Sequence, residues 1–271
     1  MLSILNSISS LTAENALSST QTNLQKTLTE LSTGLKINSG SDDAAGLSIA
    51  NGLQANISAL TQSSQNASDG VGLLQTADGA LSQVTTLLDR AVTLATEAST
   101  GGLSTSQATA LDTEYQSILT EIGNIGTTTN YNGTAIFGAS ATIYTSDGTS
   151  GGSSTVTTAV SALTTAALGV TGTSLTSAAN AQTALSDISA AISTVAANRG
   201  SIGASVNRLT ADANVENTEV TNLTAAQNNV QNADIGQTVA QMTQFNILQQ
   251  TGMAALSQSN QAQQAVLKLL Q

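Results

Sequence analysis

Carboxylates are almost the only side chains in this sequence that could take part in catalysis or metal binding. The 271 residues include 17 Asp and Glu but no His and no Cys. Without His or Cys, the usual nucleophile–base triads, imidazole metal centres and thiolate metal sites cannot be built. The carboxylates form no pair with a clear spacing for acid–base work. We therefore expect no catalytic residue, no metal and no cofactor, and a protein that is not an enzyme.

The adjacent acids Asp42 and Asp43 come closest to a carboxylate pair. They follow a break in the hydrophobic pattern that contains Gly34, and they precede a predicted helix. Gly34 fits a helix C-terminal cap, where a left-handed backbone costs glycine little. A carboxylate just before a helix can accept its free N–H groups and meets the positive end of its dipole. We interpret all three residues as helix caps and linker, with a metal or acid–base pair as the weaker alternative.

Arg199 lies between Val195 and Ile202 on an apolar stripe. A charge in such a place costs desolvation energy unless it is paired. We expect its guanidinium to meet a carboxylate or backbone carbonyls of the facing helix or of a neighbouring subunit. Extension of the side chain into solvent is the alternative.

Composition and charge narrow the class of protein further. Aromatic residues make up 2% and charged residues 8% of the chain, and the formal net charge is −11. Such a surface repels nucleic acid and anionic membranes, so neither is an expected partner. The first residues have no basic leader and no continuous apolar run, and no stretch is apolar enough to span a bilayer. We expect a protein that is cytoplasmic or leaves the cell without a cleaved signal.

Apolar residues recur at spacings of three and four over long stretches, which is typical of coiled-coil-like helices. The pattern predicts helices over 17–35, from 44 or 45 to about 99, over 104–125, and through 185–213 to about 231. The two longest, of about 50 residues each, would measure roughly 75–80 Å. Their similar lengths favour an antiparallel pair in an elongated rod with both chain ends together. The absence of Pro suits uninterrupted helices.

The middle of the chain, residues 138–176, is rich in Ser, Thr and Gly. Asn132-Gly133 and Asp147-Gly148 are hairpin-turn signals, and short strands could include Ile136, Phe137, Ile143 and Tyr144. We expect short β-hairpins that cap the far end of the rod, with a flexible linker as the alternative.

Both end segments are helical in pattern but nearly free of charge. The only charged residue in 1–25 is Glu14, and the only one in 235–271 is Lys268. A solvent-exposed helix normally keeps a charged face, and isolated helices are marginal. We expect these segments to pack against copies of themselves, with a buried helical hairpin in a monomer as the alternative. The packing residues would be Leu5, Ile8, Leu17, Leu24, Leu28, Leu31, Ile235, Val239, Met242, Leu248, Leu256, Val266 and Leu269.

Residues 31–50, LSTGLKINSGSDDAAGLSIA, resemble the N-terminal signature of bacterial flagellins. Asn66–Gly70, Thr76–Leu81, Ile247–Met253, Asn260-Gln261 and Val266–Leu270 also resemble the family. The resemblance covers roughly 1–137 and 180–271. Ser41, Gln263 and Gln271 depart from the family pattern, which often has a basic residue, a Pro and an Arg in those places.

The resemblance implies a mainly α fold. Long antiparallel coiled-coil-like helices would have the terminal helices packed together at one end and a small β-hairpin region at the other. Segments 1–42 and 235–271 would form the filament core, 43–137 and 177–234 the rod, and 138–176 a variable tip.

The resemblance also implies a function. The protein would be a structural subunit that assembles with itself into the extracellular flagellar filament used for motility. Implied partners are an export chaperone, the flagellar secretion apparatus, and hook-associated junction and cap proteins.

A vertebrate Toll-like receptor recognises flagellins in the region that aligns with Asp89–Glu97. Arg90 and Leu94 match the key positions of this region, and Glu114 matches an acidic position on the next helix. Val92, Thr93 and Glu97 differ from the family pattern. The alternative is that Leu94 belongs to the core and Arg90 is a solvated or intersubunit charge.

Two other functions compete with the filament subunit. A hook–filament junction protein has related end segments but usually matches the SDDAAGLSIA portion less well. A secreted adhesin or receptor ligand would need a folded tip with binding side chains, and the tip region offers only Tyr131, Phe137 and Tyr144.

Overall fold

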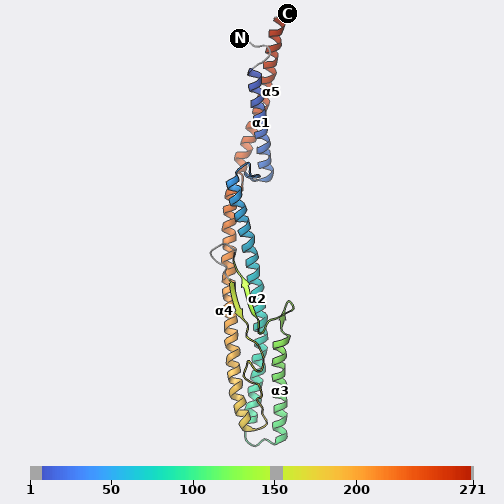
Figure 1. Ribbon diagram of the computed structural model, residues 1–271, viewed down its shortest axis with the longest axis vertical. Coiled ribbons are helices and arrows are strands. Elements are labelled where there is room, and N and C mark those ends of the chain that lie inside the picture. Colours follow the sequence, from blue (N-terminus) through green and yellow to red (C-terminus); the bar gives the residue numbers. More distant parts are fainter. Residues whose placement is uncertain (1–7, 147–154, 270–271) are drawn as a thin grey trace. The chain divides into compact units, whose positions relative to one another are not determined.

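The protein is mainly helical, with two small antiparallel strand pairs, as the sequence predicts. The computed structural model describes residues 8–146 and 155–269. In chain order the elements are α1 (Ile8–Thr33), α2 (Ala44–Ser99), α3 (Thr105–Thr128), β1 (Asn130–Tyr131), β2 (Thr134–Ala135), β3 (Ser140–Tyr144), β4 (Thr155–Ala159), α4 (Ala178–Gln231) and α5 (Ile235–Leu269) (Figure 1). The bounds of α2 and the end of α4 agree with the hydrophobic pattern.

The chain divides into two compact units, each with its own internal contacts. Unit 1 comprises 1–55 and 223–271, and unit 2 comprises 56–222. Unit 1 therefore contains α1, α5 and the adjoining ends of α2 and α4. Unit 2 contains the remainder of α2 and α4, together with α3 and all four strands.

The parts of α2 and α4 in unit 2 pack in antiparallel fashion along rows of small and aliphatic residues spaced seven apart. On α2 the buried rows are Ala67, Leu74, Leu81, Leu88 and Ala95, and Ala77, Val84, Ala91 and Ala98. On α4 one row runs Ala181, Ile188, Val195, Ile202 and Leu209. A repeat of seven keeps one seam of each helix facing its partner, and Ala in the rows lets the two backbones approach closely.

Polar contacts fix the alignment of these two helices. Arg199 on α4 holds Asp78 on α2 through two hydrogen bonds, Nε to Oδ1 at 2.7 Å and Nη2 to Oδ2 at 3.2 Å. The expectation that the guanidinium meets a carboxylate of the facing helix is confirmed. Further along, Ser63 on α2 donates to Glu216 on α4 at 2.6 Å. The order of these pairs shows that the helices run in opposite directions.

The Ser/Thr/Gly-rich middle segment packs against the helices of unit 2. It supplies buried residues to the same core as α2, α3 and α4, namely Ile143, Val156, Val160, Leu163, Leu168, Val170 and Leu175. The linker alternative is therefore wrong for the described part of this segment. Seven widely spaced aliphatic side chains thus anchor the segment in a core that it shares with three helices.

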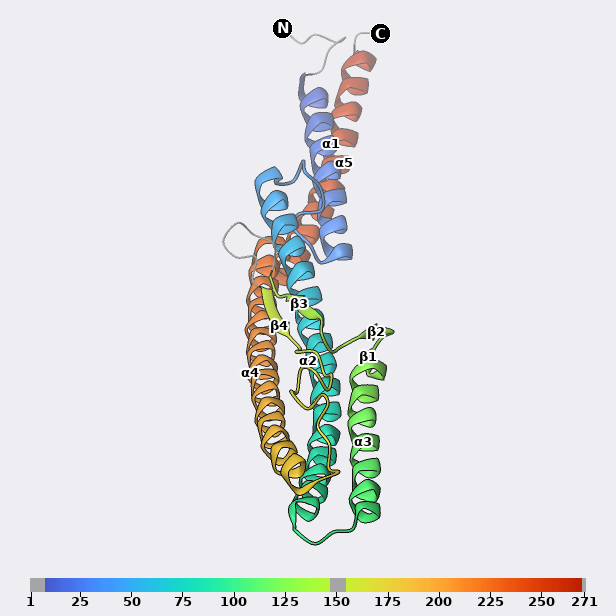
Figure 2. The same ribbon diagram turned by 60° about the horizontal axis from the view of Figure 1, so that its bottom comes forward.

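The hairpins form, but their place differs from the one expected. Asn132 and Gly133 have φ of 51° and 79° and join β1 to β2, while β3 pairs with β4 over five residues. The end of β3 lies beside the middle of α2, where Ser63 and Asn66 approach the carbonyl of Tyr144 (Figure 2). The strands thus run alongside the helices instead of capping their far end. Ile136 and Phe137 follow β2 and lie outside the strands, and Asp147-Gly148 lies outside the described residues.

Two glycines on α3 give a matched test of this packing. A Cβ on Gly126 would overlap the backbone carbonyl of Leu163, whereas a Cβ on Gly123 would meet open space. Gly126→Ala should lower the free energy of unfolding by about 1–3 kcal/mol through overpacking. Gly123→Ala should raise it by about 0.5–1 kcal/mol, because Ala is the better helix former. Urea unfolding followed by circular dichroism measures both, and equal stabilisation by the two variants would contradict the close approach.

Candidate assembly surface

Within unit 1, helices α1 and α5 form an antiparallel pair. Ser10 and Ser259 share a hydrogen bond of 2.9 Å between their hydroxyls. A Cβ on Gly252 would lie 3.4 Å from a methyl group of Leu17, so the two helices approach closely there. Leu24 is buried further along α1.

The turns that follow α1 and α4 are joined by backbone hydrogen bonds. Gly34, at φ 73°, ends α1, and its N–H donates to the carbonyl of Glu30 at 2.9 Å. The Gly34 carbonyl accepts the N–H of Ala233, and the N–H of Lys36 donates to the carbonyl of Gln231 at 2.8 Å. The linker therefore fastens the start of α5 to the end of α1.

The two acids of the linker have different roles. Asp43 Oδ1 accepts the Gly46 N–H at 2.9 Å, which is the N-cap hydrogen bond of α2. Asp42 does not cap α2, which corrects the expectation for this residue. Its carboxylate turns back to accept the N–H groups of Asn38 and Ser39, and Lys26 lies 3.0 Å away.

These contacts stabilise the ionised form of Asp42. The hydrogen bond with Lys26 is the largest influence, followed by the N–H of Asn38 and the hydroxyl of Ser39, and together they lower the pKa of Asp42 to about 2. One side chain thus connects α1 to the loop that leads into α2. A metal role for the acid pair gains no support from this arrangement, because one carboxylate is used by the loop and the other by the helix.

The residues expected to pack in a polymer differ in exposure. Leu24 is buried, whereas Leu17, Leu31, Met242 and Leu256 are half-buried. Ile8, Leu28, Ile235, Val239 and Leu248 are exposed, Ile8 by 79%. Leu5 and the side chains of Val266 and Leu269 lie outside the described part of the chain.

Exposed apolar side chains concentrate in unit 1. Among the described residues, nine of the eleven exposed large hydrophobic side chains belong to this unit, although it is the smaller one. They are Ile8, Leu11, Leu28, Ile49, Ile235, Val239, Ile247, Leu248 and Met253, and we call them the unit 1 apolar set. Burying the exposed half of such a side chain contributes about 1 kcal/mol. Covering the whole set would yield an energy comparable to the stability of a small domain.

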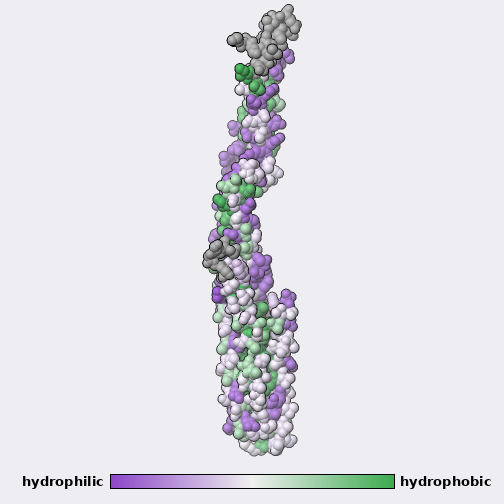
Figure 3. Space-filling view, viewed as in Figure 1, coloured by the Kyte–Doolittle hydropathy of each residue, from purple (hydrophilic) through white to green (hydrophobic). Residues whose placement is uncertain are grey.

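Several Thr side chains on the helices that carry this set have partners within their own helix. On α1, the hydroxyls of Thr20, Thr22 and Thr29 each donate to the carbonyl four residues earlier, and Thr243 does the same on α5. A hydroxyl that is satisfied in this way can be removed from water at low cost. In Figure 3, much of the visible surface of unit 2 is white or pale, the colours of Ser, Thr, Gly and Ala.

The residues that match the receptor region lie between α2 and α3. Arg90 and Glu114 form an exposed ion pair, with Nη2 2.7 Å from Oε1. Leu94 is 1% exposed and belongs to the core. The alternative that Leu94 belongs to the core is therefore confirmed, because its side chain is enclosed by the α2–α3–α4 packing.

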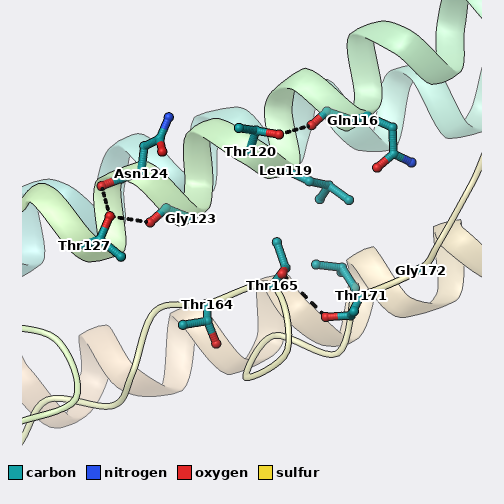
Figure 4. Close-up of a pocket in the computed structure, with 11 residues that line it drawn as sticks. Gln116, Leu119, Thr120, Gly123, Asn124, Thr127, Thr164, Thr165, Thr171 and Gly172 are labelled. Carbon is teal, nitrogen blue, oxygen red and sulfur yellow. Dashed lines mark hydrogen bonds between the residues drawn. The ribbon is translucent and has the colours of Figure 1, made fainter.

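The hollow beside α3 offers little chemistry to a small molecule. A hollow of about 460 Å³ lies between α3 and 164–172, lined by Thr, Asn, Gln, Gly and two aliphatic residues (Figure 4). It has no ionisable side chain, so acid–base chemistry has no group to use there. Among the described residues, no cluster of three or more Asp or Glu could hold a metal. None of the helices over 8–146 and 155–269 is long and apolar enough to cross a membrane.

Comparison with known proteins gives the family of this mainly helical chain. The model of the bacterial flagellin N-terminal helical region matches residues 4–142, and that of the C-terminal helical region matches 185–270. The chain belongs to the bacterial flagellin family. Flagellins are structural proteins, which confirms the expectation that the chain is not an enzyme.

Similar proteins include the phase 1 flagellin of Salmonella naestved and a flagellin of Salmonella budapest. Each is 43% identical over 111 residues, which is 41% of this chain and 22% of the relative. The match thus spans about a fifth of the length of these relatives. A crystal structure of Bacillus cereus flagellin is similar with a TM-score of 0.50 and 30% identity, over 60% of this chain and 94% of that one.

The Lys26–Asp42 contact predicts a pH dependence. Because folding lowers the pKa of Asp42, its contribution to stability is present above the ordinary value of 3.8 and is lost as pH falls towards about 2. Lys26→Met removes the largest influence on the pKa of Asp42, so this pKa should rise towards its ordinary value. Carboxyl-carbon NMR shifts followed from pH 6 to 1.5 measure this, and an unchanged midpoint in the variant would contradict the role given to Lys26.

Proposed function

We propose that this chain is the structural subunit of a bacterial flagellar filament and that it assembles with copies of itself. The observation that carries the proposal is the unit 1 apolar set, most of which lies on α1 and α5, and the sequence of α5 has a single charged residue, Lys268. A single copy leaves these nine large apolar side chains, counted among the described residues of the unit, exposed to water. Identical copies packed side by side would cover them without burying unpaired charge.

The arrangement of α1 and α5 supports a place for these helices in the filament core. Two helices packed against each other cover only one side of each helix, so the opposite sides remain for neighbours. In this proposal 1–42 and 235–271 form the core, 43–137 and 177–234 the surrounding wall, and 138–176 faces outward. The internal hydrogen bonds of the Thr hydroxyls reduce the cost of removing these helices from water.

The extracellular location and the remaining partners belong to the same proposal. An export chaperone, the flagellar secretion apparatus, and hook-associated junction and cap proteins would act before and during assembly, as the family resemblance implies. The absence of Cys means that no disulfide has to be opened for passage of an unfolded chain. Recognition by a Toll-like receptor would have to use Arg90 and Glu114 without the buried Leu94.

Two valines allow a matched test. Val239 on α5 is 41% exposed and belongs to the unit 1 apolar set, whereas Val215 on α4 is 65% exposed in unit 2. Val239→Asp should leave the monomer folded and reduce polymerisation at least tenfold, because packing would bury a charge. Val215→Asp should polymerise nearly as well as the original chain. Sedimentation and electron microscopy measure filament yield, and equal losses in both variants would argue against the role of α5.

Removal of the last 37 residues tests the role of α5 as a whole. Deletion of 235–271 takes away α5 but none of unit 2. We expect no filaments, while circular dichroism still reports a cooperatively unfolding helical protein. Filaments of normal length from the shortened chain would contradict the proposed core.

A further inference from the structure

Glu216 occupies a core position of the α2–α4 seam. It lies seven residues after Leu209, in the row that continues from Ile188, Val195 and Ile202, and it is only 6% exposed. Every earlier member of this row is Ala or a larger aliphatic residue. A carboxylate in this place loses hydration that a leucine would not need, so the acid costs stability unless something positive or hydrogen-bonding meets it.

The contacts of Glu216 satisfy only half of its carboxylate. Oε1 accepts the hydroxyl of Ser63 at 2.6 Å. Oε2 is enclosed, and no donor reaches it among the described residues. One turn earlier on the same face of α4, Oδ2 of Asp212 is also enclosed without a hydrogen bond. Arg208 Nε lies 3.9 Å from that oxygen, too far for a hydrogen bond.

A third element brings another oxygen to the same place. The carbonyl of Tyr144, at the end of β3, lies 3.5 Å from the Ser63 hydroxyl and 3.4 Å from the side-chain nitrogen of Asn66. Both contacts are at the long limit for hydrogen bonds. The Ser63 hydroxyl thus lies beside both Oε1 of Glu216 and the carbonyl of Tyr144, and Asp212 lies one turn away from Glu216 on α4.

Glu216 Oε2 and Asp212 Oδ2 are both enclosed without a hydrogen-bond donor. Because an enclosed carboxylate oxygen without a donor costs stability, the folded cluster would be stabilised by a bound positive charge.

We infer that Asp212, Glu216 and the carbonyl of Tyr144 form a binding site for one divalent cation of the calcium class. Calcium takes six to eight oxygen ligands, accepts carboxylate, carbonyl and water oxygens, and tolerates irregular geometry. Two carboxylates four residues apart on a helix lie on one face and can share one ion. Magnesium suits the site less well, because it requires near-octahedral geometry and gives up its water reluctantly.

A cation here would join α2, α4 and the middle segment. With two carboxylates and otherwise neutral ligands, we expect weak binding, with a dissociation constant of about 0.1–1 mM as in extracellular calcium modules. Such a site would fill outside a cell and stay empty in a cytoplasm low in calcium. This link to export depends on the proposed function, whereas the cation binding itself does not.

Thermal unfolding of the full chain as a monomer tests the site, with EDTA or 10 mM calcium chloride at pH 7.5 and constant ionic strength. The Tm of the original chain should rise by roughly 3–8 °C with calcium. Glu216→Gln should have a higher Tm than the original chain in EDTA and no response to calcium. Asp212→Asn should also lose the response. Glu219→Gln removes one negative charge from an exposed neighbouring position. This control variant should keep the rise in Tm with calcium.

Isothermal titration calorimetry should find one calcium per original chain and none for Glu216→Gln. The inference is overturned if calcium leaves the Tm of the original chain unchanged, or if Glu216→Gln responds equally. It is also overturned if a shift from pH 7.5 to 5 in EDTA raises the Tm while calcium does not, because the site would then hold a proton. Glu216→Gln should still form filaments, so failure of calcium binding is distinguishable from failure of the proposed function.

Discussion

The close contact between α2 and α4 determines where most of unit 2 lies. Each helix presents rows of residues spaced seven apart, and these rows contain Ala together with Leu, Ile or Val. The small residues let the backbones approach, and the larger ones fill the remaining gaps. The seam is narrow, so it leaves grooves at its sides. α3 and the aliphatic residues of the middle segment fill these grooves, which explains how a segment rich in Ser, Thr and Gly becomes part of a core.

The helices of unit 1 are covered less completely by other elements than those of unit 2. The loop that follows α1 is well fixed, because it exchanges backbone hydrogen bonds with the turn between α4 and α5. Lys26 of α1 also forms an ion pair with Asp42 of this loop. The α1–α5 pair, however, has few buried apolar residues, Leu24 being one of them. The difference between the units follows from the number of packed layers. Unit 2 surrounds its seam with a third helix and strands, whereas the α1–α5 pair has no described element over its outer sides.

The helices could be predicted from the sequence because their pattern is long and regular. The start of α2 and the end of α4 were predicted to within a residue, and the pairing of Arg199 followed from the cost of a charge on an apolar stripe. The turn at Asn132-Gly133 was predictable because both residues need positive φ. Such local constraints can be recognised in a short stretch of chain.

The remaining features depend on contacts that the sequence does not display. The burial of Val156, Val160 and Leu163 could not be inferred from a segment with so few aliphatic residues, since it requires grooves made by other helices. Asp42 and Asp43 look equivalent in the sequence, yet Lys26, sixteen residues earlier, gives the first a different role. Glu216 was missed although a signal existed. Counting by sevens from Ala181 reaches Glu216 after Leu209, and an acid in that row is unexpected.

The Thr hydroxyls of α1 and α5 and the oxygens around Glu216 differ in how far they are satisfied. On α1 and α5, Thr hydroxyls bond to their own helix, so these groups need no partner from a neighbouring copy. Around Glu216, buried oxygens lack donors, so the cluster requires one specific positive partner. Polar groups that are already satisfied suit repeated contacts between copies, because any group left unpaired would be buried again in every subunit of the polymer.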